Sequence, residues 1–451
     1  MTDDDDQRGE RAVITVVLFG TLVGPLNSTM IAVALPRMAS DLHVDSATMS
    51  WLVTAYLIAM AALQPVAGKL GDRLGRRPVL LGGYALFGVA SALAAFVGSL
   101  PVLIVCRVVQ AAAGALVMPT GMALLREAVP GERLGRTLGF MGAIMPLAAA
   151  VGPVLGGVLV QFGGWQAIFL VNIPITLFTF VLGWYVIPHR PPQPGRQRFD
   201  LVGAAWLCAL LVGLAALLDL TPGGLVLPVL CVALAVAAGA FVRYELRHPD
   251  AVLQPRLFSR VPFVAATGGI ALANLAFYVT LLAVPLLLHR HGVSTGTTGL
   301  LLGALTLAGS PAALASGRLA DRLGLRVPAV VGLVLIVVGL LPLVFVPMWL
   351  PLPLLAISLA VAGAGVGLSM PPFQLGAVRS VPETHTGAAT GVFFTSRYLG
   401  SIAGTSLLAG PLAPSAGGGF TTLFAVLAMV AAAGAVVSAA LPGRALAPAS
   451  H

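Results

Sequence analysis

Charged side chains are scarce in this chain. Asp, Glu, Lys and Arg together make up 9% of its 451 residues, against about 25% in ordinary soluble proteins. Hydrophobic residues make up 58%, so the composition excludes a water-soluble globular protein. The longest polar connections, 188–200 and 243–262, are too short to hold a soluble catalytic domain. Any function therefore belongs to the apolar part of the chain.

Cysteine is equally rare. The three residues Cys106, Cys208 and Cys231 all lie in apolar stretches. An odd number of buried cysteines offers no disulfide framework, and we expect all three to be small core residues.

The residue patterns of enzyme active sites are missing from the sequence. It contains no metal-ligand cluster, no nucleotide-binding loop and no catalytic triad, and none of its 16 acidic residues falls at the middle of a long apolar segment. His289 and His291 flank Arg290 in a predicted loop, where solvated imidazoles are favoured over a metal site. We therefore expect no enzyme activity, no cofactor and no bound metal.

Long apolar segments are abundant. A helix needs about 20 apolar residues to cross a bilayer, and fourteen segments reach that length. The sequence thus predicts an all-α polytopic membrane protein, with the first span retained because it is too long for a signal peptide and has no cleavage site. The predicted spans are 12–34, 48–68, 78–97, 101–127, 136–160, 165–187, 201–219, 223–242, 263–288, 297–316, 328–348, 351–375, 386–409 and 417–441.

The basic residues are distributed unevenly between the two sides of these spans. If the N-terminus is cytoplasmic, 21 of the 25 Lys and Arg residues lie on the inner side, Arg37 and Arg290 lie outside, and Arg107 and Arg397 fall within spans. The positive-inside rule then predicts a multi-pass protein of the inner (plasma) membrane with both termini in the cytoplasm. This explains the net charge of +9 without a nucleic-acid partner.

A ten-residue motif occurs twice, at 68–77 and again 249 residues later at 317–326. Both copies fall in an inner loop, between spans two and three and between spans ten and eleven. A carboxylate there can dock at a helix N-terminus and be clamped by arginines, so the motif predicts a conformational latch. Its residues are Gly68, Asp72, Arg73, Gly75, Arg76, Arg77 and, in the second copy, Asp321.

At these residues the chain resembles the major facilitator superfamily. Three more motifs are similar to those of its fourteen-helix drug:proton antiporter branch: residues 26–36, then Arg107 to Gln110 with Gly114, and the antiporter motif at 152–157. The resemblance implies two six-helix bundles, 1–187 and 263–451, joined by a linker, 188–262, that carries two extra transmembrane helices. It also implies that Gly152, Pro153, Gly156 and Gly157 line the interface between the bundles and seal it against leak.

Polar and flexible residues inside the predicted spans are the candidates for substrate binding, although each could instead serve only helix packing. They are Asn27, Arg107, Gln110, Met118, Met145, Asn274, Tyr278 and Arg397. In the resembled branch an aspartate usually stands where this chain has Asn27. An amide does not titrate, so proton coupling is in doubt. We expect a monomer that contacts membrane lipids and a small-molecule substrate, with protons as an open question.

Three functions are compatible with these features. The first is secondary active export of hydrophobic or amphipathic small molecules by alternating access, as in multidrug efflux and antibiotic resistance. The second is a facilitator or importer of an organic anion, suggested by two arginines within spans that contain no central carboxylate. The third is a membrane sensor or lipid-handling protein that does not transport.

Overall fold

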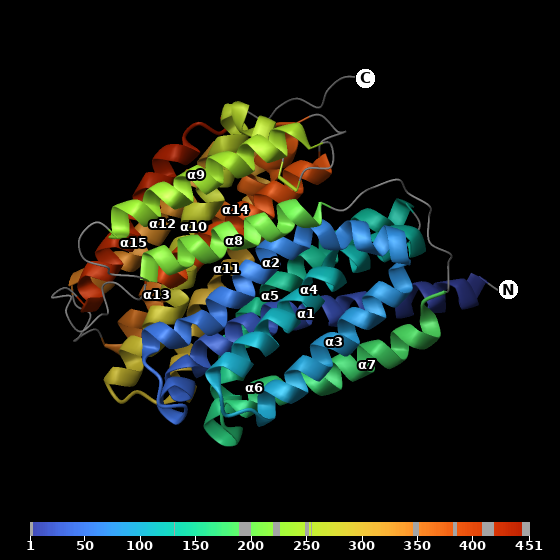
Figure 1. The fold of residues 1–451 in the computed structure, drawn as a ribbon, viewed down its shortest axis with the longest axis horizontal. Helices are drawn as coiled ribbons and strands as arrows, with labels where there is room; N and C mark the ends of the chain where they lie inside the picture. Colours follow the sequence, from blue (N-terminus) through green and yellow to red (C-terminus); the bar gives the residue numbers. More distant parts are fainter. Residues whose placement is uncertain are drawn as a thin grey trace.

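The computed structural model describes residues 3–129, 131–188, 200–219, 226–248, 252–253, 255–345, 351–381, 386–407 and 419–443. Within these residues every regular element is a helix (Figure 1). The helices are α1 (Asp3–Asp41), α2 (Ser46–Leu74), α3 (Arg76–Phe96), α4 (Leu100–Ala128), α5 (Gly131–Gly163), α6 (Gln166–Leu170), α7 (Asn172–Val186), α8 (Leu201–Asp219), α9 (Val226–Arg247), η1 (Pro255–Ser259), α10 (Val261–Arg290), α11 (Thr295–Leu323), α12 (Arg326–Phe345), α13 (Leu352–Arg379), α14 (Thr386–Leu407) and α15 (Gly419–Ser438).

These helices confirm the all-α polytopic fold. Ten of the described helices are long and apolar enough to cross a membrane, and shorter apolar stretches lie in α2, α5 and α8. The predicted span 165–187 is the one that the structure divides, into α6 and α7, with a break at Val171. Pro174 explains the break, because it has no N–H to donate to the carbonyl of Leu170, the last residue of α6.

The first seven helices pack mainly on one another, as do α10 to α15. In Figure 1 the first group, blue to green, fills the lower right, and the second group, yellow to red, lies to the left and above. The two groups meet where α5 contacts α11, α2 contacts α14 and α1 contacts α10. The extra helix α8 lies against both α2 and α14, and α9 packs on α8 and η1.

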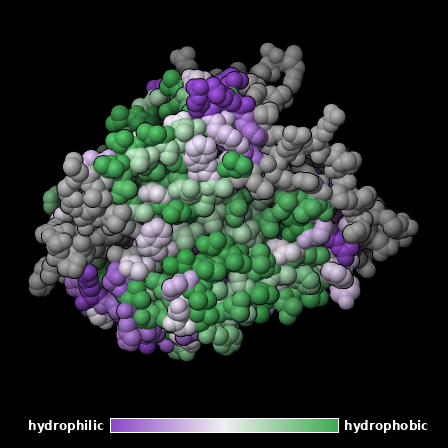
Figure 2. Space-filling view, viewed as in Figure 1, coloured by the Kyte–Doolittle hydropathy of each residue, from purple (hydrophilic) through white to green (hydrophobic). Residues whose placement is uncertain are grey.

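The outer surface of the bundle is apolar. Figure 2 shows a broad hydrophobic area across the visible face, with hydrophilic residues gathered at its margins. On α9, Val229, Val232 and Val236 are each more than 60% exposed, as expected for a helix that faces lipid. Cys231 is also exposed on α9, and Cys208 is only half-buried. The expectation of three core cysteines is therefore wrong for Cys231, because α9 packs mainly on α8 and leaves much of its own surface exposed.

The repeated motif has the same backbone form in both copies. Gly75 ends α2 with φ 92°, and Gly324 ends α11 with φ 79°; this left-handed region is open to glycine at little cost. The residues that follow also correspond: Arg77 donates to the carbonyl of Trp184 at the end of α7 (2.6 Å), and the Arg326 side chain donates to the carbonyl of Leu441 beyond α15 (2.9 Å). Each copy thus ties a tight turn to the end of the last helix of its own group.

Fourteen alternating crossings place the start of α1 and the end of α15 on the same side of the bundle. We call this the terminal side and the opposite one the far side. At the far side the two groups are in close contact: the Thr54 hydroxyl on α2 donates to that of Thr405 on α14 at 2.7 Å. The groups are therefore closed against each other at that end.

Candidate functional site: a buried polar network between the bundles

Arg107 on α4 is fully buried. Its Nη1 donates to Oε1 of Gln110, one turn later, at 2.9 Å. The guanidinium lies over the ring of Tyr56 on α2, 4.0 Å from the ring centroid, where the negative face of the aromatic ring stabilises the cation. Its Nε and Nη2 have no hydrogen-bond acceptor among the described residues. The site therefore holds a buried positive charge with two guanidinium nitrogens, Nε and Nη2, available to donate to a ligand or water.

The amide groups of Asn27 and Gln110 extend this charge into a network across the first bundle. Gln110 Nε2 donates to Ser91 Oγ on α3 at 2.7 Å. Asn27 Nδ2 on α1 faces Gln110 Oε1 at 3.5 Å, and Asn172 Nδ2 on α7 donates to Asn27 Oδ1 at 3.1 Å. All four side chains are fully buried. They are uncharged, so the guanidinium is the charged group of this network.

Tyr278 on α10 connects the network to the second bundle. Its hydroxyl lies 3.5 Å from Oγ of Ser28, the residue next to Asn27 on α1. Both side chains are buried. The polar centre is thus bordered by both halves of the chain.

The other predicted binding residues lie outside this network. Asn274 Nδ2 donates to the carbonyl of Arg397 (3.0 Å) and to Ser401 Oγ (2.6 Å), and so joins α10 to α14. Arg397 is half-buried, and its Nε has no acceptor among the described side chains. Met118 accepts a contact from Gln64 Nε2 at 3.6 Å. The side chain of Met145 is outside the described residues.

The antiporter motif lies where α5 passes between α1 and α11. A Cβ on Gly156 would lie 2.9 Å from the Cα of Met30, and one on Gly157 would lie 3.0 Å from the carbonyl of Thr295 and 3.1 Å from the Cα of Gly299. A Cβ on Gly152 would likewise meet the Thr29 side chain, and a Cβ on Gly299 would lie 2.5 Å from the carbonyl of Pro153. The helices approach each other so closely because the glycines at these contacts have no side chain.

The latch motif is described only in part. The side chains of Gly68, Asp72, Arg73 and Asp321 lie outside the described residues. Arg76 donates to the Ala123 carbonyl (3.0 Å) and pairs with Glu127 (2.5 Å), both at the end of α4. Arg77 stacks over Trp184 at 5.3 Å from the ring centroid. These two arginines contact helix ends of their own bundle; the predicted clamp on the motif's carboxylate stays a prediction, because the Asp72 side chain lies outside the described residues.

Three members of the network were missed in the sequence: Tyr56, Ser91 and Asn172. Each is a polar residue inside a predicted span, which was the only signal available. Asn172 was the strongest, because an amide in hydrocarbon needs partners. Within the described residues no group of three His, Cys, Asp or Glu side chains could hold a metal ion.

The sequence profile of the Major Facilitator Superfamily matches residues 17–405. The chain is 32% identical to the multidrug efflux pump LfrA of Mycolicibacterium smegmatis, over 88% of this chain and 79% of that protein. It is 33% identical to the tetracenomycin C resistance and export protein of Streptomyces glaucescens, over 71% of this chain and 61% of that protein.

A third relative matches over nearly the whole length. The uncharacterized MFS-type transporter YvkA of Bacillus subtilis is 31% identical over 96% of both chains. Among solved structures, the crystal structure of a D-xylose–proton symporter aligns with a TM-score of 0.69 and covers 96% of this chain and 98% of that one. The sequence identity there is 14%, so this likeness concerns the fold alone.

Proposed function

The chain belongs to the major facilitator superfamily, and from that premise we propose that it exports hydrophobic or amphipathic small molecules by alternating access. The observation that carries the proposal is the buried centre shared by both bundles, with Arg107 and Gln110 on one side and Tyr278 on the other. An apolar interior suits an apolar substrate, and a few polar groups fix its orientation. Two relatives with export or efflux in their names support the direction of transport.

The close packing of α5 on α11 supports a rocking mechanism. Gly157 and Gly299 allow a backbone contact at the far side, and such a contact can break and re-form as two rigid bundles tilt. We propose that the protein lies in the plasma membrane with both termini in the cytoplasm. The far side then faces the outside of the cell. In this proposal the far-side contacts belong to a state closed to the outside, and a monomer takes its substrate from the cytoplasm or inner leaflet.

We expect no proton to be exchanged at the network itself. Asn27 is hydrogen-bonded to Asn172 and faces Gln110, and none of these amides titrates. The fixed charge of Arg107 would also disfavour a cation beside it. Coupling, if present, then uses a group elsewhere in the chain.

A second candidate function is transport of an organic anion. The observation in its favour is Arg107, whose Nε and Nη2 are buried without an acceptor among the described residues. A carboxylate would accept hydrogen bonds from Nε and Nη2 in the bidentate geometry that arginine prefers.

The experiment that tests these functions uses proteoliposomes with an imposed pH gradient. We expect a fluorescent hydrophobic compound to be transported by the native protein, with a rate that depends little on the gradient. In Asn27→Asp protein, transport of a cationic compound should become dependent on pH, because a carboxylate now lies beside the substrate. Inhibition by organic anions alone would favour the second function, and no transport of either class would favour a sensor or lipid-handling protein.

A further inference from the structure

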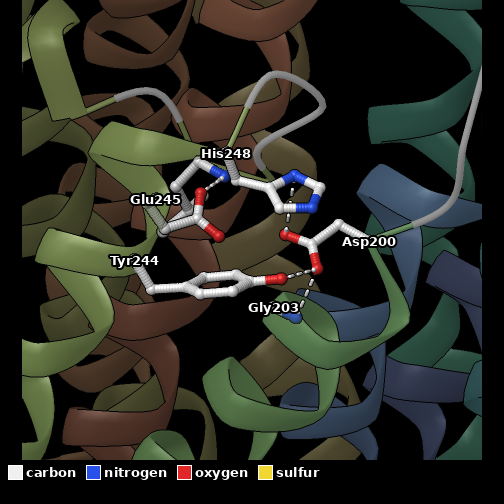
Figure 3. Close-up of polar contacts among 6 residues, drawn as sticks. Asp200, Gly203, Tyr244, Glu245 and His248 are labelled. Atoms are coloured by element: carbon white, nitrogen blue, oxygen red, sulfur yellow. Dashed lines mark hydrogen bonds and ion pairs between the residues drawn. The ribbon is translucent and has the colours of Figure 1, made fainter.

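Two buried carboxylates lie at the junction of the extra helices, away from the central network. Asp200 immediately precedes α8 and is 4% exposed, and Glu245 lies in the last turn of α9 and is 2% exposed. Asp200 Oδ1 accepts hydrogen bonds from the Gly203 backbone N–H (2.7 Å) and from the Tyr244 hydroxyl (2.8 Å). Glu245 Oε2 accepts one from the Leu253 N–H (2.6 Å). Figure 3 shows these groups converging from α8 and α9.

The second oxygen of each carboxylate has no hydrogen-bond donor among the described residues. These atoms are Asp200 Oδ2 and Glu245 Oε1. A Cβ on Gly203 would contact both of them, at 2.8 Å for Glu245 Oε1, so they border the same small space. His248 Nδ1 lies 3.9 Å from Asp200 Oδ2, and its ring stacks on Tyr244 at 5.2 Å between centroids.

Two ionised carboxylates cannot share such a space without cost. Burial disfavours each negative charge, and each charge disfavours the other. One proton removes the repulsion and one of the two buried charges, because a protonated carboxyl can donate to the free oxygen of its neighbour. His248 is the nearest basic group to Asp200 in the described cluster.

We infer that Asp200 and Glu245, with His248 beside them, form a proton-binding site that controls how firmly the end of α9 is joined to the start of α8. Asp200 caps α8, and Glu245 holds Leu253 in the segment that leads to η1 and α10. With the proton bound, these contacts are compatible with burial. Once it is lost, repulsion between the carboxylates loosens the end of α9 from the start of α8. The strength of this contact between α8 and α9 then depends on pH and is independent of substrate binding at the central network.

Charged and titratable groups also lie on the elements around the site. Of these, Tyr244 and His248 contact Asp200 directly, and Arg243, Arg247 and Arg256 are exposed. On α2 the side chains of Lys69, Asp72 and Arg73 lie outside the described residues. The elements packed against the site carry these titratable groups: Cys231, Arg243, Tyr244, Arg247 and His248 on α9 or directly after it, Arg256 on η1, Cys208 and Asp219 on α8, Tyr56, Lys69, Asp72 and Arg73 on α2, and Arg397 and Tyr398 on α14.

Infrared spectroscopy of the whole protein in lipid nanodiscs tests the proposal. Exposed carboxyl groups are ionised at about pH 7, so a protonated-carboxyl C=O band at that pH reports a buried acid. We expect this band in the native protein and its loss in Glu245→Gln, whose amide can donate to Asp200 in place of the proton. The melting temperature of the native protein should fall from about pH 6 to about pH 8, and this slope should flatten in the variant.

Asp41→Asn is the matched control, because Asp41 is an exposed acid paired with Arg37 at the far side. It should keep both the band and the slope. If Glu245→Gln does not insert, Asp200→Asn carries the same expectation. A native protein without the band at about pH 7 would overturn the proposal, as would a band and slope that survive both substitutions. An ion pair between a carboxylate and Lys69 would give the first of these results.

Discussion

At the scale of single residues, Arg107 determines the character of the central site. A guanidinium within a membrane span is costly, and this one is stabilised by the Tyr56 ring on one face and by Gln110 at one nitrogen. Both contacts depend on the flat, forked shape of the group as well as on its charge. Lysine carries the same charge on a single nitrogen and cannot replace both contacts.

We therefore expect Arg107→Lys to lower the transport rate by roughly tenfold or more, since a hydrogen bond to a buried charged group contributes about 1.5–3 kcal/mol. The measurement is efflux from proteoliposomes containing equal amounts of inserted protein. Arg37→Lys serves as the control, because Arg37 is an exposed side chain paired with Asp41. Transport at the native rate in Arg107→Lys would mean that only the charge matters.

At the scale of helices, the glycines of α5 determine how closely the two bundles meet. Gly156 faces α1 and Gly157 faces α11, so successive residues serve contacts with different bundles. The atoms that a Cβ on Gly157 would meet are backbone atoms of Thr295 and Gly299, which cannot move aside as a flexible side chain can. This contact therefore tolerates no side chain without separation of the helices.

Gly157→Val should hold the far side partly open, because overpacking of a well-packed contact costs about 1–3 kcal/mol. We expect severalfold slower transport and faster labelling, by a membrane-impermeant maleimide, of a cysteine placed at the buried Thr298. The three native cysteines are replaced by alanine for this measurement.

Gly82→Val on α3 is the matched control for that experiment. A Cβ on Gly82 has no atom within 4 Å, so labelling and transport should stay as in the parent protein. Equal behaviour of the two valine variants would show that the close approach of α5 and α11 is not required.

At the scale of the whole molecule, the uneven distribution of basic residues predicts the orientation of the protein in the membrane. Of 25 Lys and Arg residues, 21 fall on the terminal side of the spans. Several are also held in the fold there: Arg76 binds the end of α4, Arg77 the end of α7 and Arg326 the residues after α15. The same arginines thus serve membrane insertion and the packing of helix ends.

Reporter fusions test this orientation. We expect green fluorescent protein fused to the C-terminus to fluoresce, since the positive-inside rule predicts a cytoplasmic terminal side, and alkaline phosphatase inserted at Gly292 between α10 and α11 to be active. Phosphatase inserted at Gly75, in the first copy of the repeated motif, should be inactive. The reverse pattern would place the termini outside and would invert the proposed direction of transport.

The sequence alone determined the number of crossings, their boundaries to within several residues, and the positions of the repeated loops. These are local properties: an apolar segment enters the bilayer because of its own transfer free energy, and Gly75 and Gly324 make tight turns because of their own backbone freedom. The break at Val171 was also encoded locally, by Pro174, but the hydrophobicity of the segment concealed it.

The tertiary structure alone decided which polar residues meet. Asn27, Gln110 and Asn172 come from three helices, and Asp200 and Glu245 are 45 residues apart along the chain. Whether such side chains converge depends on how each helix is rotated and how closely it packs, and small residues such as Gly157 and Gly203 set that distance. Hydrophobicity places a helix in the membrane but is nearly indifferent to its rotation there. The rotation follows from packing and hydrogen bonding among helices, which are properties of the assembled bundle.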